Sequence, residues 1–413
     1  MELHTSIDLI FRREYSKIVA YLTNKYSPHY IDFIEDAVQE ALLKAMMLWP
    51  FHAMPENPSG WLYRVANNHL IDQLRRNQKT VPFEIPESAL STDGKVPEMA
   101  ETELPDERLK MIFACCHPSL QEVEQIMLSL KLLCGLSVKE IAAALIKKED
   151  AVKKAITRGK KKFQTRIGAL TVPEGNELRS RLDVVLKVIY LLFNEGYKST
   201  EGQHLIRKDI CEEAIRLAGI LHENRYCNTP DLNGLLALMC FSAARFDARV
   251  NSDGELLTLE HQDRSLWDRN YINLATYFLA ESAAGNHLSQ YHLEAAIAGH
   301  HSTAENFQAT DWEAILFIYD QLATLEGTPI VALNRLVVLE KVNGPGEALK
   351  ELEALNIDGK LKSNYLFHSI KADFQIALGN IAEGIQSLKT AIWLASNSIE
   401  IRFLERKLQS LDR

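Results

Sequence analysis

Side chains that could bind an anionic polymer are concentrated in one segment of the chain. Residues 139–166 hold ten Lys or Arg against three acidic residues, a net charge of +7, whereas the whole 413-residue chain carries −9. Long cationic and hydroxyl side chains on a helix can reach phosphates and base edges. The local reversal of charge therefore indicates a nucleic-acid partner, and a solvated basic helix without one is the alternative.

Two helices must position these side chains. The run Ser137–Leu145 predicts a supporting helix, and Val152, Ile156, Gly159 and Phe163 give a second helix one apolar face that packs inward. This is the pattern of a helix-turn-helix. Gly159 costs roughly 1 kcal/mol of helix propensity relative to alanine, so tight packing against the partner helix is expected there. The side chains predicted to contact DNA are Lys147, Lys148, Lys153, Lys154, Thr157, Arg158 and Lys161, and Lys160 is expected to project with them.

A second polar surface is predicted in residues 8–79, which indicate three or four helices with a proline-rich loop at Pro50–Gly60. Ser59 is a candidate N-cap for the helix that follows the loop. The polar side chains expected on the outer faces are Asp36, Gln39, Glu40, Lys44, Arg64, Asn67, Asn68, Asp72 and Arg75. Aromatic residues beside them, such as Trp61, suit unstacked bases, although such aromatics are more often part of a core.

These blocks resemble conserved regions two and four of the extracytoplasmic-function sigma factors of bacterial RNA polymerase. Region two is matched by Asp36–Ala41, Asn57–Leu62 and Asn67–Arg76, and region four by Leu136–Ala142 with Arg158–Lys160. The resemblance implies two partners, promoter DNA and core RNA polymerase, the latter contacted at its β′ clamp helices and β flap.

The resemblance also implies roles for individual residues. Those expected to bind the polymerase are Asp36, Gln39, Glu40, Leu43 and Lys44. Those expected to melt and read the minus-ten element are Asn57, Ser59, Trp61, Arg64, Asn67, Asn68, Asp72, Arg75 and Arg76. The second helix of the helix-turn-helix would read the minus-thirty-five element. Ala155 stands where many relatives carry arginine, so the sequence of that element does not follow from the resemblance.

An acidic segment separates the two blocks. Residues 80–107 hold eight acidic residues against Lys95 alone, a net charge of −7, together with four prolines. This composition predicts an extended, flexible linker. The resemblance adds that it would occupy the basic RNA channel of the polymerase, and a merely solvated linker is the alternative. The predicted domains are residues 1–79, the linker 80–107, residues 108–170 and an extension, residues 171–413.

The extension is almost entirely of helical period, which makes the predicted fold all-α. Ile330–Leu355 and Phe367–Leu394 repeat one plan of helix, turn and helix, near the period of tetratricopeptide repeats. The extension resembles that of a sigma-factor subgroup with a large helical-repeat domain, through Tyr190–Tyr197, Gln262–Asp268, Thr310–Trp312 and Ala332–Arg335. Residues that could line a concave surface for a peptide, protein or small-molecule ligand are Asn194, Glu195, Tyr197, Asp263, Arg264, Trp267, Asn334 and Arg335. Helix capping and internal ion pairs are the alternative for each.

Several function classes are disfavoured. No apolar run is long enough to span a bilayer and no signal peptide is apparent, so a cytoplasmic protein without a membrane partner is expected. Six cysteines lack Cys-x-x-Cys spacing, which predicts reduced thiols and neither a metal nor another cofactor. His292, His300 and His301 lack the partners that catalysis needs, so no enzyme is expected.

The sequence therefore predicts a sigma factor that directs promoter-specific initiation, regulated in cis by its C-terminal helical array. The alternative is a helical-repeat adaptor or a ligand-sensing DNA-binding regulator that does not act as a sigma factor.

Overall fold

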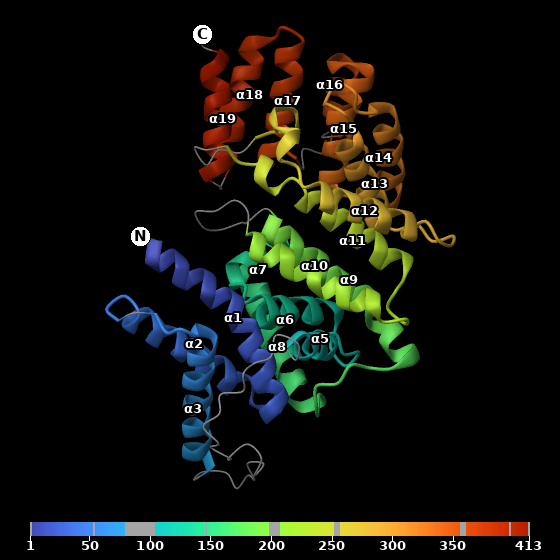
Figure 1. The fold of residues 1–413 in the computed structure, drawn as a ribbon. Coiled ribbons are helices and arrows are strands. Elements are labelled where there is room, and N and C mark those ends of the chain that lie inside the picture. Colours follow the sequence, from blue (N-terminus) through green and yellow to red (C-terminus); the bar gives the residue numbers. More distant parts are fainter. Residues whose placement is uncertain are drawn as a thin grey trace. The chain divides into compact units, whose positions relative to one another are not determined.

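The computed structural model describes residues 2–52, 54–78, 104–145, 147–197, 207–251, 257–355, 361–395 and 398–411. The described residues form helices and no β-strand, which confirms the predicted all-α fold (Figure 1). Most of the acidic segment, residues 80–103, lies outside the described residues, so the flexible linker stays a prediction.

The chain forms two compact units. Unit 1 comprises Met1–Gly196 and Asp209–Cys227, and unit 2 comprises Tyr197–Lys208 and Asn228–Arg413. The domain boundaries predicted from the sequence remain a prediction, because a compact unit is defined by contacts and not by function. Each unit is described by itself below.

Unit 1 begins with a group of packed helices. These are α1 (Glu2–Tyr26), the short 3₁₀ helix η1 (Pro28–Tyr30), α2 (Ile31–Leu48) and α3 (Pro58–Gln78). The helices α2 and α3 lie against each other, and α1 packs on both (Figure 1). The buried side chains at this junction include Val38 and Leu42 of α2 and Leu62 and Leu70 of α3, so the expected inner faces are confirmed.

The start of α3 differs from the expectation. Ser59 lies inside the first turn, and the Oδ1 atom of Asn57 accepts a hydrogen bond from the backbone N–H of Gly60 at 2.7 Å. Asn57 therefore caps this helix, and the prediction that Ser59 does so is wrong. The physical reason is Pro58, whose fixed φ and missing N–H favour the first helical position and move the cap one residue upstream.

The helix-turn-helix is present in unit 1. Its two helices are α7 (Val138–Ala144) and α8 (Glu149–Arg166), and α5 (Leu104–Cys115) and α6 (Glu122–Cys134) precede them. At the start of α7, the backbone N–H of Glu140 donates to Ser137 Oγ at 3.1 Å and the N–H of Ser137 donates to a Glu140 carboxylate oxygen at 2.6 Å, a reciprocal cap. The inner face predicted for α8, including Val152 and Phe163, is buried.

Two helices of the extension belong to unit 1. They are α9 (Gly175–Tyr197) and α10 (Lys208–Glu223). Lys187 of α9 forms an ion pair with Glu122 of α6 at 2.8 Å. The guanidinium of Arg108 on α5 is buried, and its ionic partner is Glu213 of α10. Because a buried cation needs a partner, α10 helps to stabilise the helix-turn-helix portion of unit 1.

Unit 2 is built from the remaining helices. They are α11 (Pro230–Ala243), η2 (Phe246–Ala248), η3 (Leu259–His261), η4 (Arg264–Leu266), α12 (Arg269–Ser282), α13 (Gln290–Thr303), α14 (Trp312–Glu326), α15 (Pro329–Asn343), α16 (Pro345–Leu355), α17 (Tyr365–Ala377), α18 (Ile381–Leu394) and α19 (Ser398–Leu411). The two predicted repeats each form a helical pair, α15 with α16 and α17 with α18 (Figure 1). The sequence patterns did not predict α14 or α19.

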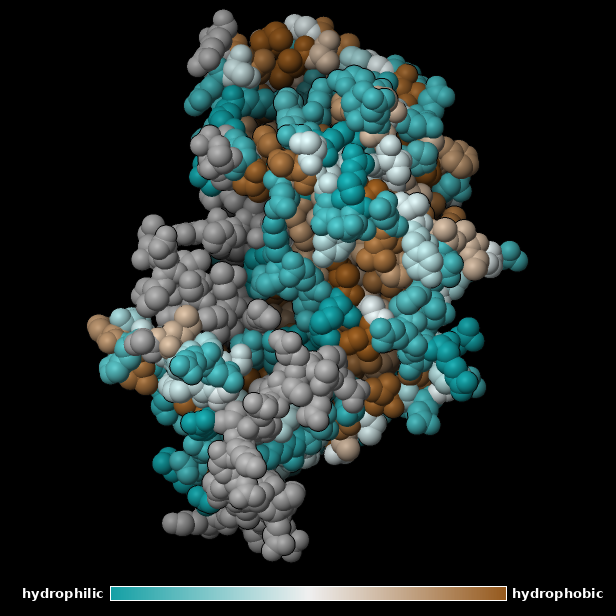
Figure 2. Space-filling model, in the orientation of Figure 1, coloured by the Kyte–Doolittle hydropathy of each residue, from teal (hydrophilic) through white to brown (hydrophobic). Residues whose placement is uncertain are grey.

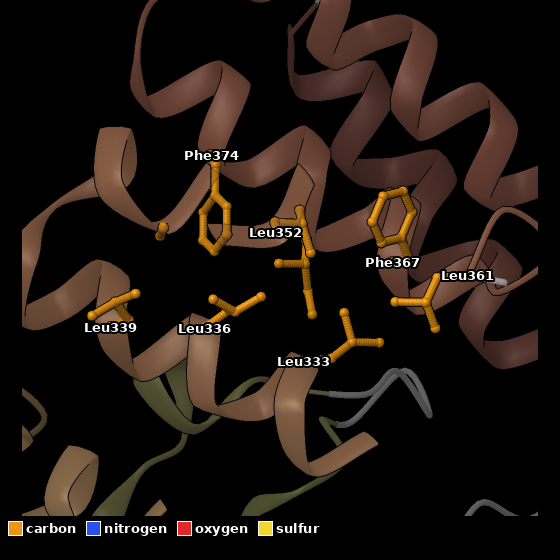
Figure 3. Packing of buried hydrophobic residues seen from close by; sticks show 9 residues of the cluster. Leu333, Leu336, Leu339, Leu352, Leu361, Phe367 and Phe374 are labelled. Carbon is orange, nitrogen blue, oxygen red and sulfur yellow. The ribbon is translucent and has the colours of Figure 1, made fainter. Parts of the chain in front are cut away.

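A continuous apolar cluster holds successive pairs of unit 2 together. Leu333, Leu336 and Leu339 project from α15 toward Leu352 of α16 and Phe374 of α17 (Figure 3). The cluster fixes α15 and α17 relative to each other.

All six cysteines lie buried and unbridged. Within the described ranges, no helix is both long and apolar enough to cross a membrane.

Candidate nucleic-acid interface

The outer face of α8 and the turn before it carry the basic side chains predicted to contact DNA. The following are exposed: Lys147, Lys148, Lys153, Lys154, Thr157, Arg158 and Lys161. Ala155, the departure from the family pattern, is buried with Val152 and Ile156 against the rest of unit 1. The exposed face is therefore cationic and free of large apolar groups. Its role in binding DNA stays a prediction.

Lys160 does not project with these side chains, so that expectation is wrong. Its ammonium group forms ion pairs with Asp32 at 3.1 Å and with the buried carboxylate of Glu35, both on α2. Gln164, one turn later on α8, donates to Asp32 at 2.6 Å. Burial lowers the pKa of Lys160, but the attraction and hydrogen bonds of Glu35 and Asp32 together outweigh burial, so the pKa is raised. One edge of α8 is thus held against the start of α2.

A second buried carboxylate supports α8 from α6. Glu124 is almost fully buried, and its carboxylate accepts from Lys162 at 2.7 Å and lies 3.5 Å from Arg158. Burial alone would raise the pKa of Glu124, but the hydrogen bond from Lys162 and that from the Gln121 backbone lower it. Arg158 is therefore partly engaged within unit 1, while its exposed part remains available to a phosphate.

The predicted polymerase-binding residues lie along the outer face of α2. Asp36, Gln39 and Leu43 are exposed, and Glu40 and Lys44 form an ion pair at 3.8 Å. The helix ends in an apolar group that sequence reasoning did not single out, comprising Met46, Met47, Leu48, Phe51 and Met54. Figure 2 shows brown and tan atoms at this end of the helix, with hydrophilic atoms among them. Phe51 is 85% exposed. Such an exposed apolar group marks a surface for a partner.

The outer face of α3 presents the other predicted DNA-binding side chains. Those exposed are Asn57, Arg64, Asn68, Asp72, Arg75 and Arg76, and Ser59 and Trp61 are half-buried. The Oδ1 atom of Asn67 accepts a hydrogen bond from the buried Tyr26 hydroxyl at 2.8 Å, so that oxygen is not available to a base. The Trp61 ring meets Trp49 edge to face, with ring centres 5.5 Å apart. Trp49 is buried and fixes the orientation of Trp61, whose ring remains partly accessible for stacking.

The residues predicted to form a concave surface are divided between the two units. Asn194 and Glu195 belong to unit 1, whereas Tyr197, Asp263, Arg264, Trp267, Asn334 and Arg335 belong to unit 2.

Within unit 2, most of these residues make internal contacts. Asp263 caps η4 by accepting from the N–H of Ser265 at 2.8 Å. The Arg264 guanidinium lies over the Trp267 ring at 4.4 Å, and Arg335 pairs with Asp320 and Glu351. Capping and internal pairing therefore account for Asp263, Arg264 and Arg335.

No group of three His, Cys, Asp or Glu side chains that could hold a metal ion occurs among the described residues.

The parts of the chain that carry these surfaces match known protein families. Residues 11–80 match the profile of Sigma-70 region 2, residues 110–163 that of Sigma-70 region 4, and residues 181–283 that of a family of unknown function, DUF6596. A protein of Rhizobium meliloti (strain 1021), described as uncharacterized, is 33% identical over 385 residues, which cover 92% of this chain and 90% of that protein. No solved structure matches the chain.

Proposed function

Because this chain belongs to the sigma-70 family, with regions 2 and 4 of the extracytoplasmic-function type followed by a DUF6596 extension, we propose specific roles for its exposed helices. Sigma factors act in transcription initiation with core RNA polymerase and promoter DNA as partners, and they are DNA-binding regulators without catalysis of their own. In our proposal α2 docks on the polymerase, α3 and the loop before it read the minus-ten element, and α8 reads the minus-thirty-five element.

The observation that carries this proposal is the separation of three chemically distinct surfaces in unit 1. The end of α2 exposes Leu43, Met46 and Met47, which suit a protein partner. The outer face of α3 combines arginines and amides with the accessible ring of Trp61, which suits unstacked bases. The face of α8 is almost purely basic, which suits duplex phosphates and guanine edges.

We further propose that unit 1, as it stands, is a closed state. The two promoter elements lie about 25 base pairs apart, roughly 85 Å along B-DNA at its ordinary rise. In the structure, Lys160 of α8 lies 3.1 Å from Asp32 of α2. Region 2 and region 4 in this arrangement are too close to reach both elements. Binding to promoter DNA therefore requires the Lys160 contacts to break.

Regulation in cis by the extension is the third part of the proposal. The helices α9 and α10 contact the helix-turn-helix part of unit 1 through Lys187 and Glu213, and both helices lead into unit 2. A conformational change in unit 2 that displaces α9 or α10 would alter the contacts of these helices with α5 and α6. The extension could thus favour either the closed or the open state of unit 1.

Transcription in vitro tests the sigma activity. The full chain is combined with core polymerase and templates that carry random upstream sequences, and transcribed templates are sequenced. Two enriched motifs at fixed spacing are expected, and the upstream motif should be lost when Lys153, Lys154 and Arg158 become alanine. The matched control removes three exposed cations of unit 2, Lys350, Lys389 and Arg402. Binding to core polymerase without initiation would indicate that the extension holds the factor inactive, and no binding at all would favour the adaptor.

Truncation tests the regulation. The cut belongs after Cys227, because a cut after Pro173 removes α10 and leaves the Arg108 guanidinium buried without Glu213. Higher activity of residues 1–227 would mean that unit 2 inhibits, and lower activity of a folded fragment would mean that unit 2 is required. Activity equal to that of the full chain would contradict regulation in cis.

A further inference from the structure

Unit 2 contains a cavity of about 930 Å³ that the sigma activity does not use. It lies among α13, α14, α15, α17 and α19, and the segment Leu257–His261 forms part of its wall. Pockets that bind small molecules have volumes of about 300 to 1,000 Å³, so this one can hold a drug-sized molecule.

Three sequence motifs that could not be assigned from region 2 or region 4 converge on this cavity. Trp312, from the motif Thr310–Trp312, and Asn334, from the motif Ala332–Arg335, line it. Arg264, from the third motif, donates to the carbonyl oxygens of His301 at 2.8 Å and Ala304 at 2.7 Å. It thereby fixes the end of α13, where His301 lines the wall.

The walls are held rigidly. The apolar cluster in Figure 3 packs Leu333 and Leu336 of α15 against Phe374 of α17. Asn334 and Val337 lie beside these leucines on α15 and line the cavity, while Phe374 itself forms part of its surface. The cavity is thus largely formed before any ligand arrives.

Aromatic rings dominate one side of the cavity. The Trp312 ring meets Phe307 at 5.0 Å and His301 at 5.4 Å between ring centres, both edge to face. Tyr319 and Phe403 also line the space. Rings in this arrangement favour a flat, apolar guest that can stack or insert between them.

The charges on the lining compensate one another. Lys341 pairs with Glu340 at 3.0 Å, and Lys407 pairs with Asp373. Arg406 and Glu260 add one further charge of each sign. Burial, with Arg245 and Arg264 nearby, lowers the pKa of His301 to about 4, so its ring is neutral at physiological pH. A charged guest would therefore find no excess of opposite charge.

Asn334 offers the cavity a polar group that can orient a guest. In the part of the chain that the structure describes, the side-chain amide of Asn334 has no hydrogen-bond partner, and it lines the cavity. An amide can donate to and accept from a single carbonyl or amide group of a ligand.

We propose that this cavity is a binding site for an uncharged, planar small molecule with fused rings and a carbonyl or amide group that pairs with Asn334. The site does not depend on the proposed sigma activity.

The test uses the full chain and Nile red, an uncharged fused-ring dye that carries one carbonyl. Titration should show a single saturable site, with the blue-shifted emission of a buried dye. Val337→Trp places a large ring in the cavity and should weaken binding by a factor on the order of ten or more. The matched control is Ile381→Trp on α18, since Ile381 is 40% exposed and Val337 39%, and it should bind as the original chain does.

A second variant tests the hydrogen bond of the Asn334 amide separately from the shape of the cavity. Asn334→Leu keeps similar bulk and should weaken Nile red by about fivefold, as expected for the loss of one net hydrogen bond. The anionic dye 1-anilinonaphthalene-8-sulfonate should bind this site more weakly than Nile red. If Val337→Trp and Ile381→Trp bind Nile red equally well, the cavity is not the binding site. If the anionic dye binds more tightly than Nile red and Val337→Trp weakens its binding, the proposal of an uncharged ligand is wrong.

Discussion

Lys160, on the otherwise DNA-facing helix α8, forms an ion pair with Glu35, a buried carboxylate of α2. This pair joins the helix assigned to the minus-thirty-five element to the helix assigned to the polymerase. The charge that Lys160 could offer to a phosphate is thereby used within unit 1. In the closed state that we propose, this contact and the one with Asp32 break before unit 1 binds a promoter.

Removal of the Lys160 ammonium should loosen unit 1. Lys160→Met leaves Glu35 buried without its cation and should lower the free energy of unfolding by about 1 to 3 kcal/mol, less than for a fully buried pair because Lys160 is partly exposed. Urea unfolding measures this, and affinity for core polymerase should rise at the same time. Lys161→Met, at the exposed neighbour, is the control and should change neither quantity.

Acid should destabilise unit 1 through Glu213. Burial opposes the charge of this carboxylate, but the hydrogen bond from Arg216 and the attraction of Arg108 lower its pKa below the ordinary 4.5. Its contribution to stability is therefore present above about pH 4.5 and is lost as the pH falls through the lower, folded-state pKa. Glu213→Gln should cost about 3 kcal/mol at pH 7, since it removes the carboxylate that pairs with the buried Arg108 guanidinium.

Thermal unfolding from pH 3 to 7 measures that change. The variant should show a weaker dependence on pH below 4.5 than the original chain. Identical pH profiles would mean that the Arg108 pair adds nothing to stability.

Substitution by alanine at two helical glycines should change the free energy of unfolding in opposite directions. A Cβ atom at Gly159 would lie 3.5 Å from the Cβ of Glu124, an ordinary contact. Tight packing therefore does not explain this glycine, and Gly159→Ala should stabilise unit 1 by about 0.5 to 1 kcal/mol. A Cβ atom at Gly384 would lie 2.6 Å from Ile376, so Gly384→Ala should destabilise unit 2 by about 1 to 3 kcal/mol. Calorimetry of both variants checks the contrast, and a loss of stability in Gly159→Ala would contradict it.

The six cysteines should be inert in the folded protein. Burial raises the pKa of the Cys116 thiol to about 12, that of Cys227 to about 11 and that of Cys240 to about 12. Ellman's reagent at neutral pH should label none of the six thiols until denaturant is added, and then all six. Fast labelling of the native protein would show that one of these sites opens locally.

Trp61 should contribute to promoter melting. Trp61→Ala removes the accessible ring beside Trp49 and should reduce open-complex formation by about 1 to 3 kcal/mol, the usual value of stacking on one base. Heparin-resistant complexes on promoter DNA measure the effect. Trp61→Phe should retain most of it, and Trp393→Ala, at a ring 82% exposed in unit 2, should have no effect.

Local patterns in the sequence predicted much of this fold because they report local physics. The spacing of Val152, Ile156 and Phe163 identified the buried face of α8. Local patterns did not predict contacts between residues that lie far apart in the sequence. Nothing near Lys160 in the sequence indicates that Glu35 lies opposite it, and Arg108 finds Glu213 only after α10 has packed.

The candidate sites also combine features that local sequence patterns predict with features that they do not. Exposed cations on α8 follow from helical periodicity, but the apolar group around Met47 and Phe51 was not predicted, since isolated methionines in a sequence do not distinguish core from surface. Asn334 was predicted to line a concave ligand-binding surface, but its place in a cavity depends on helices α14 and α19, which lie outside the two repeats recognised in the sequence.

The path of the chain also constrains how such a protein can evolve. The chain leaves unit 1 after Gly196, returns to it at Asp209 and leaves again after Cys227. The DUF6596 profile, residues 181–283, covers all three of these crossings. A recombination event with one breakpoint would therefore either divide unit 1 or place a foreign α10 against Arg108. We expect the coding sequences of the two units to be inherited together, with α10 and its partner helices changing in concert.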